Sequence, residues 1–426
     1  MTDVLLIGNL RSSLTLARKL SRAGHGVHCG VDELDPFVHT SRAVRGAFVH
    51  AAIDQAPQRT LAQVEAYLAD HHRITALIPV SEIAARLFSR HRARFAALVQ
   101  VIAPSEEVLE TCIDKPRMFE LCDEVGFPVA PRRMPADQRS LFEAVAAIGF
   151  PCVVKPADAG HFLFGRKAIV LHSMDEARAA LPHWPPEHAR LCVQAFVAGD
   201  RHILMFAAKD GVLLGAVDAR VLNTDLADGT GFTTEMISDR VHPVVARGLE
   251  RLVERLNYTG VGDVDVMVDD AAGQISFLEL NPRLGASYKA AEICGLPLSE
   301  MILALGTGQR PPACAPPWSH AVGKRLVWTK AELGALKRDV RRGDLEAIIR
   351  RAGQAFRSAL TFQHMTFDLR DPAPTAWCYL HPLLHRLGLF KAVRQAAERE
   401  RERFAGYDGA AGDALVRPEA AGLTPV

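Results

Sequence analysis

The chain has 426 residues, of which 49% are hydrophobic and 23% charged, and its formal net charge at neutral pH is +1. This length allows two or three domains, and the composition is that of an ordinary globular protein. The balanced charge argues against a nucleic-acid partner, and no apolar run approaches the roughly 20 residues that cross a bilayer, so no membrane partner is expected either.

The amino terminus leads directly into a short apolar strand and lacks the cationic and long apolar regions of a signal peptide. The eight cysteines are scattered, without a CxxC pair or a metal-ligand spacing, and most lie within apolar runs. We therefore expect buried, reduced thiols and a cytoplasmic protein.

Residues 1–112 alternate short apolar strands with helices, which is typical of a doubly wound parallel sheet. Gly8 before a helix, with Asp32 about 24 residues later, would suit a dinucleotide site. The loop after Gly8 lacks the further glycines that let backbone approach a pyrophosphate. We interpret this segment as a Rossmann-like domain that shapes a substrate cleft. Strands are expected at residues 4–7, 27–31, 76–80 and 99–103, and helices at 14–20 and 83–95.

A second unit opens at Asp114, which is a candidate N-cap for a helix that runs to about residue 125. Further on, the apolar strand 150–155 ends in Lys155, which could extend to solvent or hold a phosphate. Residues 203–207 and 212–217 are expected to form a β-hairpin, and 244–256 an amphipathic helix.

The most informative segment is 260–283, where apolar runs at 264–268 and 275–280 flank a polar turn. On the resulting hairpin, Asp265, Glu279 and Asn281 can point to the same face. Two carboxylates placed side by side repel each other, and a divalent cation removes that repulsion. Their oxygens are the ligands that Mg²⁺ accepts. The alternative is an edge hairpin with ordinary surface acids.

The order of these parts resembles the ATP-grasp superfamily. The matching sequence is Asp114-Lys115, then Val-Val-Lys155-Pro, then Val-Gln-Ala-Phe-Val-x-Gly, then Gly-Asp-Val-Asp265-Val-Met, then Leu-Glu279-Leu-Asn281-Pro-Arg283. The resemblance covers about residues 1–310. It is closest to the branch similar to the carbamoyl-phosphate synthase large chain and to predicted carboxylate–amine ligases. It implies a Rossmann-like domain and a two-lobed domain that binds ATP.

The resemblance also implies a role for each matching residue, with ATP and Mg²⁺ as cofactors and Mn²⁺ as a substitute. The ATP-binding residues would be Lys115, Lys155 and Lys167 on phosphates, Gln194, Ala195, Phe196 and Val197 beside adenine, and Asp200 on the ribose. The metal ligands would be Asp265, Glu279 and Asn281, and the catalytic cations Lys155, Arg220 and Arg283.

Two departures from the family pattern stand out. Arg201 follows Asp200, where the acid of the family often lies one or more positions later. The segment after Lys155 holds only Gly160 and Gly165, fewer than a glycine-rich phosphate flap usually has. Either Arg166 or Lys167 compensates with side-chain charge, or the flap becomes ordered only when nucleotide binds.

The fold expected is therefore α/β and α+β, an ATP-grasp fold with a mainly helical C-terminal extension. The domains expected are a Rossmann-like domain at 1–112, an ATP-grasp domain at 113–310 and an extension at 311–426. Within the second domain the small lobe covers about 113–195 and the large lobe about 196–310. In the extension, a proline-rich linker at 309–317 precedes helices at 331–352 and 389–404, a turn follows at 368–374, and the tail from about 406 is expected to be frayed.

The sequence therefore predicts an ATP-dependent ligase that activates a carboxylate as an acyl-phosphate and joins it to an amine, releasing ADP and phosphate. Small-molecule acids and amines, including amino acids, would be its substrates, and a homodimer is compatible with the sequence. Two alternatives stay open: activation of bicarbonate through carboxyphosphate, and a nucleotide-binding protein without turnover. No Gly-x-Ser-x-Gly elbow and no HExxH motif points to another chemistry.

Overall fold

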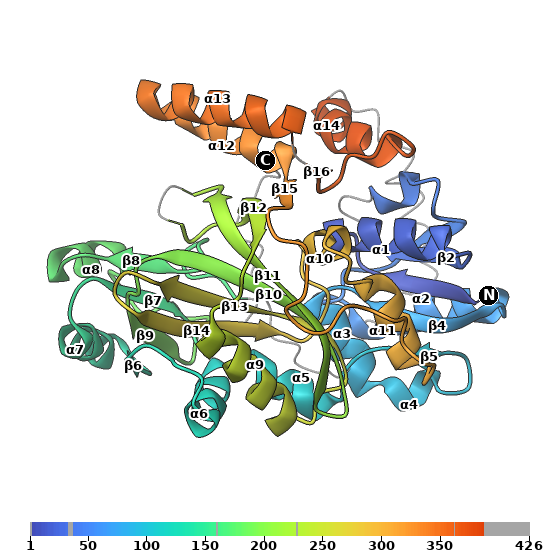
Figure 1. Cartoon of the computed structure of the whole chain (residues 1–426), viewed down its shortest axis with the longest axis horizontal. Helices are drawn as coiled ribbons and strands as arrows, with labels where there is room; N and C mark the ends of the chain where they lie inside the picture. The colour runs from blue at the N-terminus through green and yellow to red at the C-terminus, as the bar shows by residue number, and fades with distance from the viewer. Residues whose placement is uncertain (1, 33–36, 159–160, 227–228, 362, 387–426) are drawn as a thin grey trace.

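The computed structural model describes residues 2–386 except 33–36, 159–160, 227–228 and 362, and these residues form three β-sheets with surrounding helices (Figure 1). This mixture of parallel and antiparallel sheets confirms the predicted fold class. None of the helices in this part of the chain combines the length and the apolar character needed to cross a bilayer.

The first sheet is parallel and has the strand order β3-β2-β1-β4-β5. Its central strands are continuous apolar runs because helices cover both faces. The expected helix at 83–95 is divided in two, at His91. The elements are β1 (Asp3–Ile7), α1 (Arg11–Arg22), β2 (Gly26–Val31), η1 (Val38–Thr40), β3 (Gly46–Val49), α2 (Pro57–Asp70), β4 (Ile74–Pro79), α3 (Glu82–Arg90), α4 (Arg92–Phe95) and β5 (Gln100–Val101).

The carboxyl end of β4 is the point where this sheet faces the rest of the chain. The hydroxyl of Ser81 accepts a hydrogen bond from the backbone N–H of Ala84 at 3.2 Å and so begins α3 as its N-cap. Glu82 is therefore the first residue of a helix at the carboxyl edge of a parallel sheet, where ligands of such folds usually bind.

The second sheet is antiparallel, has the strand order β6-β9-β7-β8 and packs against α7 and α8 (Figure 1). The predicted N-cap is confirmed, because Asp114 Oδ1 accepts a hydrogen bond from the backbone N–H of Arg117 at 3.1 Å and α6 starts at Lys115. The elements are α5 (Glu106–Ile113), α6 (Lys115–Val125), β6 (Arg132–Arg133), α7 (Gln138–Ile148), β7 (Cys152–Pro156), β8 (Ile169–Leu171), α8 (Met174–Ala180) and β9 (Leu191–Ala195).

The third sheet is the largest, with the strand order β14-β13-β10-β11-β12-β15-β16. Both of its faces are covered: Leu204 and Phe206 on β10 pack toward α6 and α9, whereas Met205 and Ala207 pack toward α10, α11 and α1. The elements are β10 (Asp200–Lys209), β11 (Val212–Thr224), β12 (Thr233–Asp239), α9 (Pro243–Arg255), β13 (Gly260–Asp269), β14 (Gln274–Asn281), α10 (Lys289–Ile293), α11 (Leu298–Gly306), β15 (Arg325–Val327) and β16 (Gln363–His364).

The predicted hairpin between β10 and β11 is confirmed, and both strands are longer than expected. Asp210 and Gly211 form its turn with φ angles of 49° and 77°. Two consecutive positive φ values match the right-handed twist of the flanking strands, and aspartate followed by glycine is the pair that tolerates them.

The C-terminal extension is helical, as expected, but it also completes the large sheet, since β15 pairs with β12 and β16 with β15. Its helices are α12 (Thr329–Arg342), α13 (Leu345–Thr361) and α14 (Ala373–Arg386). The single helix expected at 331–352 was wrong: Gly343, with φ 72°, ends α12, and the chain reverses into α13. The helix expected at 389–404 and the frayed tail lie outside the described residues.

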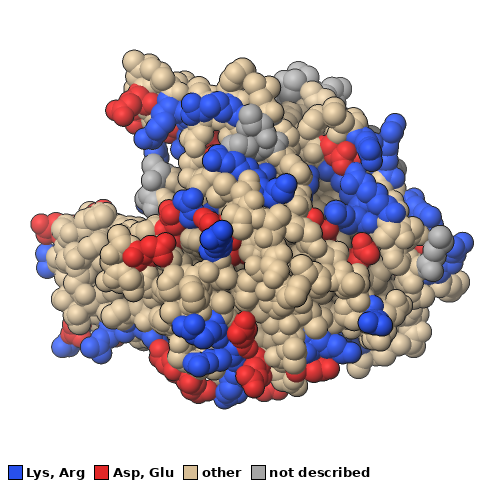
Figure 2. Space-filling model, viewed as in Figure 1, with Lys and Arg blue, Asp and Glu red and all other residues tan. Residues whose placement is uncertain are grey.

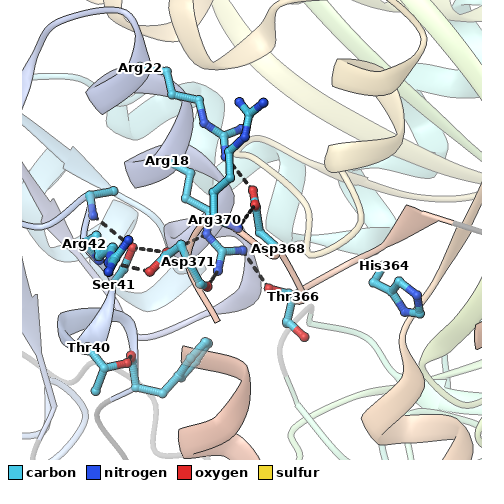
Figure 3. A network of polar contacts seen from close by, with 12 residues as sticks. Arg18, Arg22, Thr40, Ser41, Arg42, His364, Thr366, Asp368, Arg370 and Asp371 are labelled. Atoms are coloured by element: carbon cyan, nitrogen blue, oxygen red, sulfur yellow. Dashed lines mark hydrogen bonds and ion pairs between the residues drawn. The ribbon is translucent and has the colours of Figure 1, made fainter. Parts of the chain in front are cut away.

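A buried polar network holds the extension against the N-terminal sheet (Figure 3). The carboxylate of Asp371 accepts hydrogen bonds from Arg18 Nε at 2.8 Å, from the hydroxyl of Ser41 at 2.5 Å and from the backbone N–H of Arg42 at 3.0 Å. Burial alone would raise the pKa of Asp371, but these donors lower it overall. The turn expected at 368–374 thus joins two segments more than 300 residues apart in sequence.

Replacing Asp371 should destabilise the protein strongly. In Asp371→Asn the guanidinium of Arg18, which is 6% exposed, loses its counter-charge, and leaving one partner of a buried pair uncompensated typically costs about 3 kcal/mol or more. The matched control is Asp368→Asn, which breaks the more exposed pair with Arg22 and should cost about 1 kcal/mol or less. Thermal and urea unfolding of both variants would measure this, and equal midpoints would contradict the assignment.

Candidate active site

The acidic residues singled out on the β13–β14 hairpin share one face. Asp265 lies directly opposite Glu279, and Asp263 lies opposite Asn281, in the antiparallel register of the two strands. Directly opposed residues point to the same side of a sheet, so the predicted alignment of Asp265, Glu279 and Asn281 is confirmed. β14 is the edge strand of the large sheet, yet these three side chains line a cavity instead of lying on a flat surface.

The cavity has a volume of about 870 Å³ and lies between the second and third sheets. This size is that of a site for a nucleotide-sized ligand. Four parts of the chain contribute to its lining: the small sheet, the large sheet, Glu82 from the N-terminal unit, and α13 from the extension. Figure 2 shows a notch between the helices at the upper left and the lobe below them, where α12 and α13 overhang the two sheets.

Three lysines face the paired acids. Lys115 and Lys155 are buried at the start of α6 and the end of β7, and Lys167 lies just before β8. Burial lowers the pKa of Lys115, and the charge of Glu279 partly offsets that effect. Lys155 is buried and lines the cavity, so its ammonium group does not extend to bulk solvent. This excludes the first of the two interpretations of Lys155 and leaves contact with a phosphate.

The charges of these lysines decide which carboxylate is ionised. Burial by itself would raise the pKa of Glu279, but Lys115, Lys167 and Lys155 together lower it. For Asp265 the balance is opposite, because burial and the neighbouring charge of Glu279 raise its pKa to about 6. The pair therefore holds one firmly ionised carboxylate beside one that readily takes up a proton.

Asp263 is a polar residue of the same face that the sequence interpretation missed. It is 5% exposed, and burial raises its pKa to about 8. Its Oδ2 accepts a hydrogen bond from the amide of Asn281 at 3.2 Å, while its Oδ1 has no hydrogen-bond partner among the described residues. Asp263 thus orients Asn281, so that the amide oxygen can face the cavity.

The donor set fits a hard divalent cation. Within the described residues no three His, Cys, Asp or Glu side chains are grouped to hold a metal ion by themselves. Asp265, Glu279 and the amide oxygen of Asn281 would instead supply part of a coordination shell, which is how Mg²⁺ is usually held when nucleotide phosphates and water complete it.

The segment predicted to meet adenine connects the two sheets. Gln194 and Ala195 end β9, Phe196 and Val197 follow, and all four line the cavity. Asp200, at the start of β10, also lines it and forms an ion pair with Arg220 at 3.1 Å.

Arg283 and Arg220 were both expected at the reacting phosphate, and of the two only Arg283 lines the cavity. Arg283 lines the cavity and donates to Asn281 Oδ1 at 3.2 Å. In the sheet register, Arg220 lies opposite His202 of β10. The next residue of β10, Ile203, lies opposite Asp265. Adjacent residues of a strand point to opposite faces, so Arg220 lies on the other face of the sheet.

Arg201, which the sequence interpretation noted only as an irregularity, is a second arginine that lines the cavity. Arg201 pairs with Met267 on the cavity face of the sheet, and its guanidinium donates to Thr233 Oγ1 at 2.8 Å. Its charge also lowers the pKa of Asp265, against the larger effect of burial. The strand alternation after Asp200 was the signal that could have identified it.

Glu82 and the α13 residues Arg350, Arg351 and Gln354 are further cavity residues that were not predicted. Burial raises the pKa of Glu82, and the charge of Arg283 opposes that effect. Of the predicted flap, Lys167 lines the cavity, whereas Gly160 lies outside the described residues. The choice between charge compensation and ordering by nucleotide therefore stays open.

The comparisons with known proteins agree with this geometry. Residues 112–287 match the family model described as ATP-grasp domain. The chain contains an ATP-grasp domain. It has the ATP-grasp fold, with a Rossmann-like parallel sheet before the two lobes and a helical extension after them.

Among curated proteins, the chain is 27% identical over 281 residues to formate-dependent phosphoribosylglycinamide formyltransferase of Bifidobacterium adolescentis, covering 58% of this chain and 67% of that relative. It is 22% identical to a putative urea carboxylase of Emericella nidulans, but the match covers 47% of this chain and only 17% of that protein. The chain thus spans about a sixth of the length of this second relative.

Among solved structures, the chain is similar to N5-carboxyaminoimidazole synthetase from Staphylococcus aureus complexed with ADP, with a TM-score of 0.60, 13% identity, and coverage of 80% of this chain and 86% of that one. It is also similar to biotin carboxylase from Campylobacter jejuni, with a TM-score of 0.58, 16% identity, and coverage of 76% and 74%. At these identities the likeness concerns the fold alone.

Metal-dependent nucleotide binding should weaken in acid because protons compete with the cation for Asp265. A carboxylate whose pKa lies near 6 is increasingly protonated below that pH, so the affinity for ADP with Mg²⁺ should fall by up to about tenfold for each unit below 6. In the absence of metal, the pH dependence of folding stability has the opposite sign. Because the pKa of Asp265 is raised in the folded protein, protonation of Asp265 favours the folded state. The contribution of Asp265 to the free energy of unfolding is therefore lost as pH rises through 6. Calorimetric titration between pH 5 and 8 measures the first effect, and Asp265→Asn should remove the slope.

Replacing Glu279 by glutamine should abolish ADP formation and leave the fold intact. Glutamine keeps the size of the side chain but removes the ionised member of the pair, and with it the charge that raises the pKa of Asp265. Circular dichroism, thermal unfolding and ADP release would be compared with the wild type. Near-normal ADP formation by Glu279→Gln would show that the metal assignment is wrong.

Proposed function

We propose that this protein is an ATP-dependent carboxylate–amine ligase, which converts a carboxylate to an acyl-phosphate and couples it to an amine, releasing ADP and phosphate. One observation carries the proposal: the opposed carboxylates Asp265 and Glu279 face three lysines across a cavity of nucleotide size. The ATP-grasp domain and the formyltransferase relative support the same chemistry.

The nucleotide would lie between the two sheets. Lys115, Lys155 and Lys167 would contact the phosphates, because together they converge on the acids that hold the metal. The backbone of residues 194–197 would meet adenine, since this extended segment connects the two lobes and leaves polar groups facing the cavity. Asp200 would meet the ribose, although its pairing with Arg220 means that one carboxylate oxygen is already engaged.

Asp265, Glu279 and Asn281 would hold Mg²⁺, with Mn²⁺ as an alternative ion of similar ligand preference. The bound ion would neutralise charge on the phosphates and so favour the approach of an anionic acid. Asp263 would act behind these ligands by fixing the amide of Asn281.

The chemistry requires that two anions meet. A carboxylate cannot acylate an amine directly, because oxide is a very poor leaving group, whereas phosphate is a good one. Arg283 and Arg201 line the cavity on the side of the paired acids and would absorb charge on the transferred phosphoryl group and the acid. This arrangement needs no nucleophilic side chain of the protein.

The amine would be held by Glu82. It is the residue through which the N-terminal unit contributes to the described cavity lining. Its raised pKa suits a general base that takes one proton from the ammonium ion and so frees the nitrogen lone pair for attack, while the second proton lost on amide formation leaves with the phosphate. This role gives the first sheet a function in the reaction, as the sequence interpretation of a cleft-shaping domain implied.

The test is ADP release by the purified chain with pools of carboxylic acids and amines, each alone and combined. Release that needs both an acid and an amine would establish the ligase. Release that needs bicarbonate would favour carboxyphosphate chemistry, and nucleotide binding without release in any pool would favour a protein without turnover. Either of the last two results would overturn the proposal.

The two predicted arginines should differ sharply in their effect on turnover. Arg283→Met removes a cation from the cavity and should lower kcat by about a hundredfold or more, as the loss of one positioned charge typically does. Arg220→Met removes a guanidinium from the opposite face of the same sheet and should leave kcat within a few-fold, with any change confined to the KM for ATP through Asp200. Similar losses of kcat in both variants would contradict the assignment.

A further inference from the structure

The outer face of α13 carries a stripe of large apolar side chains. Leu345, Ile349, Phe356 and Leu360 are 68%, 65%, 68% and 71% exposed, which is unusual for residues of this kind on one helix. Their spacing places them on a single side. The opposite side, with Ala347, Ala355 and Ser358, is buried against the molecule. The four side chains stay exposed in the described part of the chain, and α13 itself lies at the upper edge of the molecule in Figure 1.

The four apolar residues are spaced symmetrically about the midpoint of the stripe. Leu345 and Leu360 lie at equal distances from its midpoint, as do Ile349 and Phe356, and Ala352 and Gly353 lie at the midpoint itself. A second copy of α13 running antiparallel would therefore place Leu345 against Leu360 and Ile349 against Phe356. An interface between identical copies must have this self-complementarity.

The small residues at the midpoint allow two helices to approach closely. A Cβ placed on Gly353 would meet nothing within 4 Å, so the space outside the helix at this point is open. Large side chains on either side of a small crossing point are what two interdigitating helices require.

We propose that α13 is a homodimer interface, in which the stripe of one copy packs antiparallel against the same stripe of a second copy. With about two thirds of each side chain exposed, two stripes offer on the order of 1,000 Å² of surface, about the smallest area expected of a specific interface. The sequence left a homodimer open, and the stripe assigns a surface to it.

The dimer would also stabilise the cavity wall. On the side of α13 turned away from the stripe, Arg350, Arg351 and Gln354 line the cavity. Arg351 pairs with Asp339 of α12 at 2.7 Å, and Gln354 donates to Glu235 at 3.3 Å. A second copy packed on the outer face would hold this helix in place. This consequence rests on the proposed function, whereas the dimer itself does not.

The first test is the mass of the full chain in solution, measured by size-exclusion chromatography with light scattering at micromolar to tens-of-micromolar concentration. The wild type should be a dimer, and the double variant Ile349→Glu/Phe356→Glu a monomer with unchanged circular dichroism and thermal midpoint. The matched control is Val212→Glu, which places the same charge on an apolar residue that is 63% exposed at the start of β11, and it should stay dimeric.

The second test fixes the register with cysteine variants and a short bis-maleimide. Gly353→Cys should give a cross-linked dimer beyond the wild-type background, because two midpoint residues meet at the two-fold axis. Leu345→Cys should not, because its copies would lie roughly 20 Å apart along antiparallel helices. Cross-linking at 345 but not at 353 would overturn the antiparallel arrangement.

Three outcomes would overturn the proposal as a whole: a wild type that is monomeric throughout, a dimer that survives the double variant, or a monomer that sediments with phosphatidylglycerol vesicles through the stripe. ADP release separates this proposal from the proposed function. If the wild type releases ADP and the monomeric double variant does not, the result would support both the dimer interface and the proposed function. If the wild type is a dimer but releases no ADP, the dimer interface would be supported and the proposed function would not.

Discussion

The site depends on the mutual repulsion of two carboxylates that the sheet register forces together. Asp265 and Glu279 face each other across an antiparallel pair, and burial makes their charges costly. The protein offsets this cost with ammonium groups from the opposite lobe, so that Lys115, Lys155 and Lys167 hold Glu279 in its ionised form. The two lobes are thereby coupled electrostatically, and the cavity between them is polarised before any nucleotide arrives.

Around Asp265 and Glu279, each part of the described chain contributes residues to the lining of the cavity. The small sheet supplies cations, the large sheet supplies acids and Arg283, the N-terminal sheet supplies Glu82, and α13 closes the remaining side. Such a division suits a reaction in which three reactants must meet, since no single sheet can surround all of them. The position of α13 also means that the extension belongs to the site.

Much of this arrangement could be predicted from the sequence, and the rest required three-dimensional information. The β13–β14 hairpin was predictable because apolar alternation and a polar turn mark it locally. The pairing of Asp265 with Glu279 depends in addition on an irregularity in the register between Asp265 and Val266, which the sequence pattern did not indicate. The face of the sheet on which Arg220 lies could not be predicted, because it depends on the pairing of β11 with β10, which the turn at Gly211 determines only together with a bulge. Arg350 and Arg351 were missed for a different reason: nothing local to α13 shows which distant surface it packs on.

The network around Asp371 has a consequence for any attempt to rearrange this protein. Because the extension adds strands to the large sheet and is bonded to Arg18 and Ser41 near the beginning of the chain, the first and last thirds of the described fold form one mechanical unit. A chimera that exchanges the extension with that of another ligase would have to exchange the first helix as well. The part of the cavity wall that α13 supplies is therefore tied to the first helix of the chain.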